Sequence, residues 1–459
     1  MFIASTELRT RFAAALSDLY GREVPAYKTL VEVSREVNER YLDSAGVDGE
    51  RFGSIERVTS ERHGAIRVGT PQELAQLARI FGAFGMYATG FYDLRDAAPR
   101  PIPVVATAFR PQRLDELARN PFRVFTSLLV PEDRRFFDVD LEARLRRFLD
   151  SRELFSPELL GLSDRAVADG GLKDKDAEIF IALAIAAFAL SSEPVDRAWY
   201  SELDAISSVA ADIGGVRSTH INHLTPRVLD IDDLYASMTS RGVEMIDRIQ
   251  GPPRWHGPDV LLRQTSFRAQ TEPRAFRKSD GSIRQGKLRV RFGEVESRGI
   301  ALTASGRDLY DSMIAAIDAS MEAHPCLSRE QVAESVWSTT LPATEEGLRR
   351  RGLAFFTYHL THRPAIAGLT LDRMVADGDV EARPIVYEDF LPRSAAGIFA
   401  SNLSGETVVD ADRDGAHRNI GWLSDVIGQR ILAPEEIYQT DSDASLDELE
   451  SSLGFKVAV

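Results

Sequence analysis

The stretch from Thr219 to Asp232, T-H-I-N-H-L-T-P-R-V-L-D-I-D, constrains the fold of this chain more than any other. It contains His220 and His223, and Pro226 follows closely. A proline inside a helix removes a backbone hydrogen bond and clashes with the preceding turn, whereas an edge or bulged strand accepts it. The stretch is therefore expected to be extended. Because side chains alternate along a strand, His220 and His223 should point in opposite directions.

A second segment, Arg62 to Gly69 (R-H-G-A-I-R-V-G), repeats this histidine spacing. His63 precedes Arg67 by four residues, as His223 precedes Arg227. An even separation places His63 and Arg67 on one face of a strand, with their backbones about 13 Å apart at about 3.3 Å per residue. A small ligand would fit between a histidine-bound centre and this guanidinium.

Composition narrows the class of protein. With 44% apolar and 27% charged residues, the chain is typical of globular proteins. Its net charge of −15 argues against a nucleic-acid partner, because neutralising phosphates requires clustered Lys and Arg. The single cysteine, Cys326, excludes an intrachain disulfide and a zinc site of several thiolates. The most apolar run, Ile179 to Leu190, is shorter than the roughly 20 residues that span a membrane. We expect a cytoplasmic enzyme or binding protein.

The order of the expected elements predicts an α+β fold in which residues 1–459 form a single catalytic unit. It divides into N-terminal helices (1–55), a first strand-rich module (56–110), a helical insertion (111–215), a second strand-rich module with the candidate ligands (216–304), and a helical and mixed region (305–459). Phe267 to Gln285 is polar and charged and should form an exposed hairpin or flap, and the acidic tail from Asp441 to Glu450 should be frayed.

The run Lys287 to Glu296, K-L-R-V-R-F-G-E-V-E, alternates like one strand. The alternation puts Glu294 and Glu296 on the same side as its apolar residues Leu288, Val290 and Phe292. A carboxylate on an apolar face is costly to bury unless a cation or a metal ion compensates it. Glu294 and Glu296 are therefore both candidate ligands.

Two histidines and one carboxylate on separate strands, here His63, His223 and Glu294, are the donor set of non-haem Fe(II) oxygenases. Spacing alone leaves structural roles open for each of them. Either histidine can be an ordinary core residue, and Glu294 can pair with Arg291 or Arg298 across a sheet. Arg67 and Arg227 can likewise bind scaffold carboxylates such as Asp230 or Asp232.

Several segments resemble one known family. They are E-R-H-G-A-I-R-V-G-T (61–70), P-F-R-V-F-T-S-L-L (121–129), H-I-N-H-L-T-P-R (220–227), L-L-R-Q-T-S-F (261–267), R-F-G-E (291–294) and Y-E-D-F-L-P (387–392). In this order they resemble the 2-oxoadipate dioxygenase/decarboxylase family, whose bacterial members are also called 2-hydroxyglutarate synthases. The resemblance extends to about Leu403. It implies a central β-sheet of the vicinal-oxygen-chelate type that encloses a metal site, with large helical additions.

The resemblance also implies a mononuclear Fe(II) held by His63, His223 and Glu294. Without the resemblance, Glu296 stays the second choice for the carboxylate ligand. The implied reaction converts 2-oxoadipate and O2 to 2-hydroxyglutarate and CO2, a step of lysine breakdown. Arg67 would bind the distal carboxylate, and His220 would assist by orienting a ligand or the substrate. Substrate binding is also expected at Arg393 and Ser394, although the family pattern has a small apolar residue in place of Arg393.

Two other functions stay open. One is a lyase or isomerase of the same fold that uses Zn2+ or Mn2+ on a 2-oxo acid. The other is a non-catalytic binding protein on the same scaffold, for which loss of a ligand would be the mark. Nucleotide binding and serine hydrolysis are disfavoured, because the sequence has no G-x-x-x-x-G-K-[ST] or G-x-S-x-G motif and no G-x-G-x-x-G after a strand.

Overall fold

The computed structural model describes residues 1–45, 55–97, 100–289, 291–324, 326–361, 368–402, 409–410 and 412–458. These residues form two compact units. The first unit comprises Met1–Gln250, Gln264–Ser297 and Phe390–Leu432, and the second comprises Gly251–Arg263, Arg298–Asp389 and Ala433–Val459. All candidate ligands of the sequence analysis belong to the first unit.

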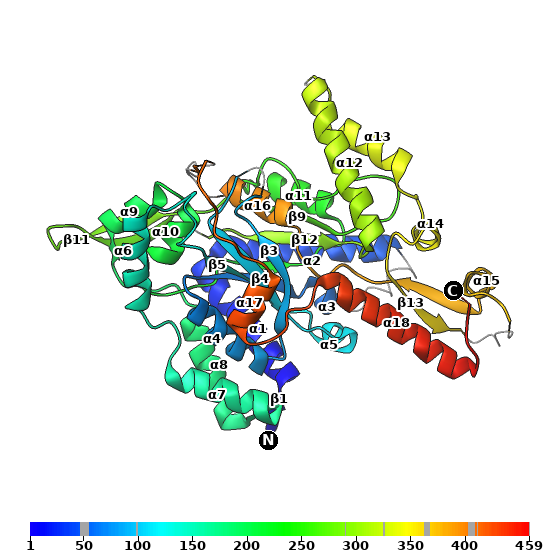
Figure 1. Ribbon diagram of the computed structural model, residues 1–459, viewed down its shortest axis with the longest axis horizontal. Coiled ribbons are helices and arrows are strands. Elements are labelled where there is room, and N and C mark those ends of the chain that lie inside the picture. The colour runs from blue at the N-terminus through cyan, green and yellow to red at the C-terminus, as the bar shows by residue number, and fades with distance from the viewer. Residues whose placement is uncertain are drawn as a thin grey trace. The chain divides into compact units, whose positions relative to one another are not determined.

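The first unit is built on a five-stranded sheet with the strand order β3-β4-β5-β2-β8; β3, β4 and β5 are labelled in Figure 1. Its strands are β2 (Glu61–Val68), β3 (Tyr87–Asp93), β4 (Val104–Arg110), β5 (Arg123–Leu129) and β8 (His223–Pro226). β2 pairs with β5 in parallel and with β8 antiparallel. The sheet therefore ends at β8, and the edge position expected from Pro226 is confirmed.

The two faces of this sheet differ in chemistry. On one face, alternate residues of four strands are apolar and belong to the main hydrophobic core: Ile66, Val68, Val105, Phe109, Val124, Leu128 and Leu224. Side chains of α1 (Ser5–Glu23) and α4 (Pro71–Ala83) complete this core. The opposite face carries His63 and Arg67, because an even separation keeps two strand residues on the same side. One face thus anchors the sheet, and the other is left for the site.

Most other elements of the first unit are helices. They are α2 (Pro25–Ala45), α3 (Ile55–Thr59), α5 (Leu114–Arg119), α6 (Val139–Asp150), α7 (Pro157–Asp169), α8 (Asp174–Ala187), α9 (Arg197–Asp204), α10 (Ser208–Gly214), α11 (Ile231–Ser240), α16 (Pro392–Asn402) and α17 (Ile420–Ile427). At the start of α4, Thr70 is the N-cap and forms a capping box with Glu73. This box fixes the turn that follows β2.

Smaller sheets complete the first unit. β1 (Phe2–Ala4) pairs with β6 (Gly171–Lys173), and β10 (Glu272–Arg277) lies between β7 (Val195–Asp196) and β11 (Ile283–Leu288). The antiparallel pairing of β10 with β11 confirms the predicted hairpin. β12 (Glu294–Arg298) pairs with β9 (Leu262–Ser266), and Glu294 and Gln264 lie in the parts of these strands that belong to the first unit.

Lys287 to Glu296 does not form the single strand that its alternation predicts. β11 ends at Leu288 and β12 begins at Glu294, while Val290 lies outside the described residues. A Cβ atom at Gly293 would overlap the ring of Phe267, so glycine permits a close approach of backbone and ring there. The expected common side for Glu294 and Glu296 survives, because both stand on β12 two residues apart.

The expectation of a helical region from 111 to 215 was wrong at β5. All seven residues of this strand are buried, because it lies inside the sheet between β2 and β4. A strand buried on both faces lacks the alternation that identifies a half-exposed strand. β5 therefore escaped prediction, although it belongs to the central sheet.

The second unit contains α12 (Ala304–Ala323), α13 (Arg329–Thr340), α14 (Glu345–Arg350), β13 (Phe356–Leu360), α15 (Leu371–Asp377), β14 (Val380–Pro384) and α18 (Pro434–Leu453). The long helix α18 runs along the β13–β14 pair (Figure 1). The expected fraying of the acidic tail was wrong, because Leu449 of α18 is buried in a small core with Met374 and Val380.

The predicted α+β class is confirmed, with a central sheet beside the candidate ligands and helices added before, within and after it. Among the described helices, none has the length and apolar character needed to cross a bilayer.

Candidate metal centre

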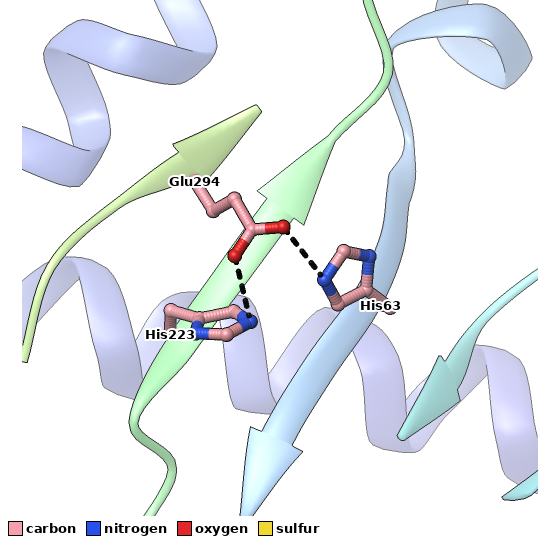
Figure 2. Close-up of side chains that lie close together, drawn as sticks. All are labelled: His63, His223 and Glu294. Atoms are coloured by element: carbon pink, nitrogen blue, oxygen red, sulfur yellow. Dashed lines mark ion pairs between the residues drawn. The ribbon is translucent and has the colours of Figure 1, made fainter. Parts of the chain in front are cut away.

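His63, His223 and Glu294 point toward one another from three strands, β2, β8 and β12 (Figure 2). Glu294 lies between the two rings: His63 Nε2 is 3.4 Å from Oε1 and His223 Nε2 is 3.4 Å from Oε2. Each residue offers one ligand atom, and these atoms all lie within 4.8 Å of one another. All three side chains are buried. This is the geometry that three ligands of one small cation require.

The sheet register explains why the histidines meet. His63 stands opposite Thr225, and Ala65 stands opposite His223. Residues opposite each other point to the same side, as do residues two apart, so both imidazoles lie on one face. β12 joins this edge beyond β8, where Val228 N donates to Glu296 O at 2.8 Å. That bond brings Glu294, two residues before Glu296, to the same edge of the sheet as the two histidines.

The environment of His223 suits a metal ligand. Among the described residues, neither ring nitrogen of His223 has a hydrogen-bond partner, although both atoms are buried. Burial, with the nearby charge of His63, lowers the pKa of His223 well below its ordinary value. A neutral imidazole keeps the lone pair that a metal ion binds. A buried ring nitrogen without a hydrogen bond is otherwise costly, so this donor set fits a cation.

His63 faces a different carboxylate at each ring nitrogen. Its Nε2 points to Glu294 and lies 3.1 Å from Thr225 Oγ1, while its Nδ1 lies 2.9 Å from Glu296 Oε2. Burial acts to lower the pKa of His63, but Glu296 and Glu294 outweigh it and raise that pKa above its ordinary value. Glu296 thus lies at the ring nitrogen away from the cluster and is not one of the three converging residues.

Gln264 of β9 belongs to the site, although the sequence analysis did not single it out. Its side-chain amide donates to Glu294 Oε1. The side-chain carbonyl oxygen of Gln264, Oε1, is buried and lacks a hydrogen-bond partner within the described part of the chain. Two aromatic rings wall the site, with Phe390 at 4.8 Å from the His63 ring and Phe292 at 5.1 Å from the His223 ring. The segment L-L-R-Q-T-S-F, which contains Gln264, was the available signal.

Arg67 lies further along β2 and binds a carboxylate that sequence reasoning did not name. Its Nη1 donates to Asp212 of α10, rather than to Asp230 or Asp232. Its guanidinium lies over the ring of Phe399 at 5.2 Å from the ring centroid. In the described structure Arg67 Nη2 is buried without a hydrogen-bond partner. Asp212 thus holds Nη1 of the guanidinium, and Nη2 remains available as a donor.

His220 belongs to the Arg67 network and not to the metal cluster. It precedes β8, so the expected alternation of His220 and His223 along one strand does not apply. Asn222 Nδ2 lies 3.0 Å from Asp212 Oδ2 and 3.1 Å from His220 Nε2. Burial lowers the pKa of His220 to about 4, so its imidazole is neutral near pH 7. Burial acts to raise the pKa of Asp212, but the Arg67 guanidinium and the hydrogen bond from Asn222 help to hold it below its ordinary value, so the carboxylate stays ionised.

Arg291 and Arg298, the alternative partners of Glu294, have other contacts in the described structure. Arg291 instead pairs with Glu23 and Glu272, and Arg298 Nη1 donates to the Tyr387 carbonyl at 3.0 Å.

Arg393 and Ser394 both lie in the first turn of α16, the helix that also carries Phe399. Ser394 is buried, whereas Arg393 is exposed. Their roles in substrate binding stay predictions.

A buried pair of histidines with one carboxylate, set beside a strand-borne arginine in an α+β fold, defines a candidate mononuclear metal centre of the facial-triad class. Comparison with known proteins identifies the family. The family model for 2-oxoadipate dioxygenase/decarboxylase matches residues 12–402, and the chain belongs to this family.

Named relatives agree. The chain is 54% identical to the 2-oxoadipate dioxygenase/decarboxylase of Mycobacterium bovis over 94% of this chain and 95% of the relative. It is 39% identical to that of Escherichia coli, over 96% and 98% of the two chains. Among solved structures, it is similar to hydroxyglutarate synthase from Pseudomonas putida in complex with 2-oxoadipate. The TM-score is 0.84, with 34% identity and 99% of each chain covered.

The Arg67–Asp212 pair yields a prediction about stability. Removing one partner of a buried ion pair leaves an uncompensated charge, so Asp212→Ala should lower the free energy of unfolding by about 3 kcal/mol or more. The exposed pair of Arg79 and Asp164 is the control, and Asp164→Ala should cost about 1 kcal/mol or less. Urea denaturation measures both variants. Equal small losses would contradict the assigned role of Asp212.

Proposed function

We propose that this chain is an Fe(II)-dependent enzyme that converts 2-oxoadipate and O2 to 2-hydroxyglutarate and CO2. The main observation behind this proposal is that three buried side chains, those of His63, His223 and Glu294, each offer one ligand atom, and these atoms lie within 4.8 Å of one another. Two imidazoles and one carboxylate leave coordination positions open, the arrangement typical of non-haem Fe(II) oxygenases. Relatives at 54% and 39% identity are 2-oxoadipate dioxygenase/decarboxylases, which supports this reaction class, and a related structure was solved with 2-oxoadipate.

The proposed ligands are His63 Nε2, His223 Nε2 and one oxygen of Glu294. Fe(II), when bound, supplies neighbouring positions for a chelating 2-oxo acid and for O2. The reaction balances without another reductant: one carboxylate leaves as CO2, and both atoms of O2 end in 2-hydroxyglutarate, one in its new carboxylate and one in its hydroxyl.

Residues around the ligands hold them in place. Glu296, 2.9 Å from His63 Nδ1, would keep the proton on that nitrogen and leave Nε2 free for the metal. Gln264 donates to Glu294 Oε1 and so orients the carboxylate between the rings. Phe390 and Phe292 pack against the two imidazoles and exclude water from that side. The chain therefore contributes a site that is organised before any ligand arrives.

Arg67 would bind the distal carboxylate of the substrate through Nη2, the donor that Asp212 leaves free. Charge-assisted hydrogen bonds of this kind favour a dicarboxylate over a monocarboxylate. His220 and Asn222 act through Asp212 and are positioning residues for the guanidinium. Arg393 and Ser394 would contact the same end of the substrate.

We also propose that the enzyme works in the cytoplasm, in lysine breakdown, and that the whole chain acts as one catalytic unit. A reducing compartment suits both Fe(II) and a chain whose single cysteine, Cys326, is exposed.

Metal content and oxygen uptake test the proposal. Wild-type protein reconstituted anaerobically with Fe(II) should hold about one iron per chain and consume one O2 for each CO2 released from 2-oxoadipate. His63→Ala, His223→Ala and Glu294→Ala should each lose most of the iron, because three protein ligands are the minimum of the facial site. His359→Ala, on β13 of the second unit, is the control and should keep it.

Each outcome has a clear meaning. A variant that keeps full iron removes its residue from the ligand set. Turnover of a 2-oxo acid without O2 uptake would replace the dioxygenase with a lyase or isomerase. Metal-replete protein that turns over no 2-oxo acid would indicate a binding protein.

Substrate selection yields a second prediction. Arg67→Lys keeps a cation for Asp212 but loses the second donating edge of the guanidinium. Loss of one charged hydrogen bond of about 1.5–3 kcal/mol should reduce kcat/KM for 2-oxoadipate about 10- to 100-fold. The value for 2-oxohexanoate, which has no distal carboxylate, should change little and is the internal control. Equal losses for both substrates would remove Arg67 from distal recognition.

A third prediction concerns Glu296. Glu296→Gln removes the charge beside His63 Nδ1 while preserving shape, so iron affinity should fall about 10- to 100-fold, as for other residues that orient metal-bound histidines. Glu116→Gln, which loses a pair with Arg9 away from the cluster, is the matched control. Chelator competition measures both affinities. Unchanged affinity in Glu296→Gln would show that His63 does not depend on this carboxylate.

A further inference from the structure

The last turn of α1 contacts both segments that lead into the ligand-bearing strands. The hydroxyl of Tyr20 donates to the carbonyl oxygens of Asn222 at 3.0 Å and Phe292 at 2.7 Å. Asn222 immediately precedes His223, and Phe292 stands two residues before Glu294. Asn222 and Phe292 lie 202 and 272 residues after Tyr20, so the two segments are 70 residues apart in sequence. One phenol thus joins them.

The phenol is a permanent donor at this position. Tyr20 is fully buried, and burial raises its pKa, so the hydroxyl stays protonated. Its single proton is shared between the two carbonyl oxygens. Leaving a buried carbonyl oxygen without its hydrogen-bond donor lowers the stability of the fold. The two segments are therefore held at the separation that one hydroxyl can bridge.

A second contact from the same helix turn supports the first. Glu23, one turn after Tyr20, forms an ion pair with Arg291, the neighbour of Phe292. The Arg291 guanidinium lies 5.7 Å from the centroid of the Tyr20 ring and also pairs with Glu272 at 2.8 Å. Arg291 is buried, so these contacts are not loose surface pairs. The segment before β12 is therefore bound to α1 through two consecutive residues of its own, Arg291 and Phe292.

The segment before β8 is bound to the third ligand strand as well. Asn222 N donates to Ala65 O at 2.8 Å, and Ala65 lies two residues from His63 on β2. The Phe292 ring packs against the His223 ring at 5.1 Å. Through Tyr20, the backbone near all three candidate ligands is connected by a short chain of buried contacts.

We propose that Tyr20 is a positioning residue for the metal centre: its hydroxyl sets the spacing between the backbone before His223 and the backbone before Glu294. This inference rests on the proposed metal site and adds a residue from an N-terminal helix to it. Tyr20 touches neither substrate nor metal. Without the hydroxyl, the two segments relax apart, and the two ligands no longer meet at one bonding distance.

Tyr20→Phe tests the proposal, because it removes only the hydroxyl. Tyr27→Phe is the matched control, since Tyr27 is equally buried and packs against Tyr20 at 5.1 Å, while its hydroxyl contacts Ser17 on the helix side. The probe is Co(II) added to metal-free protein, followed by chelator competition and by its visible absorption bands. Tyr20→Phe should bind Co(II) about tenfold more weakly or worse, with shifted bands, as for other supports of metal ligands. Tyr27→Phe should match wild type in both readouts.

Other outcomes overturn the proposal in separable ways. If wild-type protein binds no Co(II), the metal centre itself fails, and the role of Tyr20 fails with it. If wild type binds and Tyr20→Phe has the same affinity and bands, only the role of Tyr20 is refuted. Equal losses in Tyr20→Phe and Tyr27→Phe would reduce it to general packing. Should circular dichroism show Tyr20→Phe unfolded, Glu23→Gln carries the test, and unchanged Co(II) affinity in that folded variant refutes the proposal.

Discussion

A buried carboxylate between two imidazoles is the constraint around which this unit is organised. Removing Glu294 from water is costly, and among the described residues its carboxylate is contacted by His63, His223 and the Gln264 amide. His223 is held neutral by burial and has no hydrogen-bond partner among the described residues. A divalent cation resolves both costs at once, because it neutralises the carboxylate and occupies the unused lone pair.

The central sheet separates structural and chemical roles by face. One side of β2 and its neighbours packs against α1 and α4, while the other presents His63 and Arg67 four residues apart. The helices do more than cover this sheet. Asp212 of α10 holds Arg67, and Tyr20 of α1 holds the segments before β8 and β12. Helical regions on both sides of the first strand module thus supply the supports that strands alone lack.

Local signals accounted for much of this arrangement. Three features follow from neighbours in sequence and were predictable: His63 and Arg67 share one face of a strand, Pro226 implies an edge strand, and Thr70 and Glu73 form a capping box. β5 was not, because burial on both faces removes alternation. Asp212 was not either, since a pair formed across 145 residues leaves no local pattern. The convergence of three distant ligands needed the family resemblance to be named, and the structure then supplied the contacts of Glu296, Gln264 and Tyr20.

The most direct test of the central claim is anomalous diffraction at the iron edge, from crystals of Fe(II)-loaded protein grown without O2. The account predicts one strong iron peak at bonding distance, about 2.0–2.2 Å, from His63 Nε2, His223 Nε2 and a Glu294 oxygen. A peak bound elsewhere in the chain, or one that lacks any of these three ligands, would contradict it.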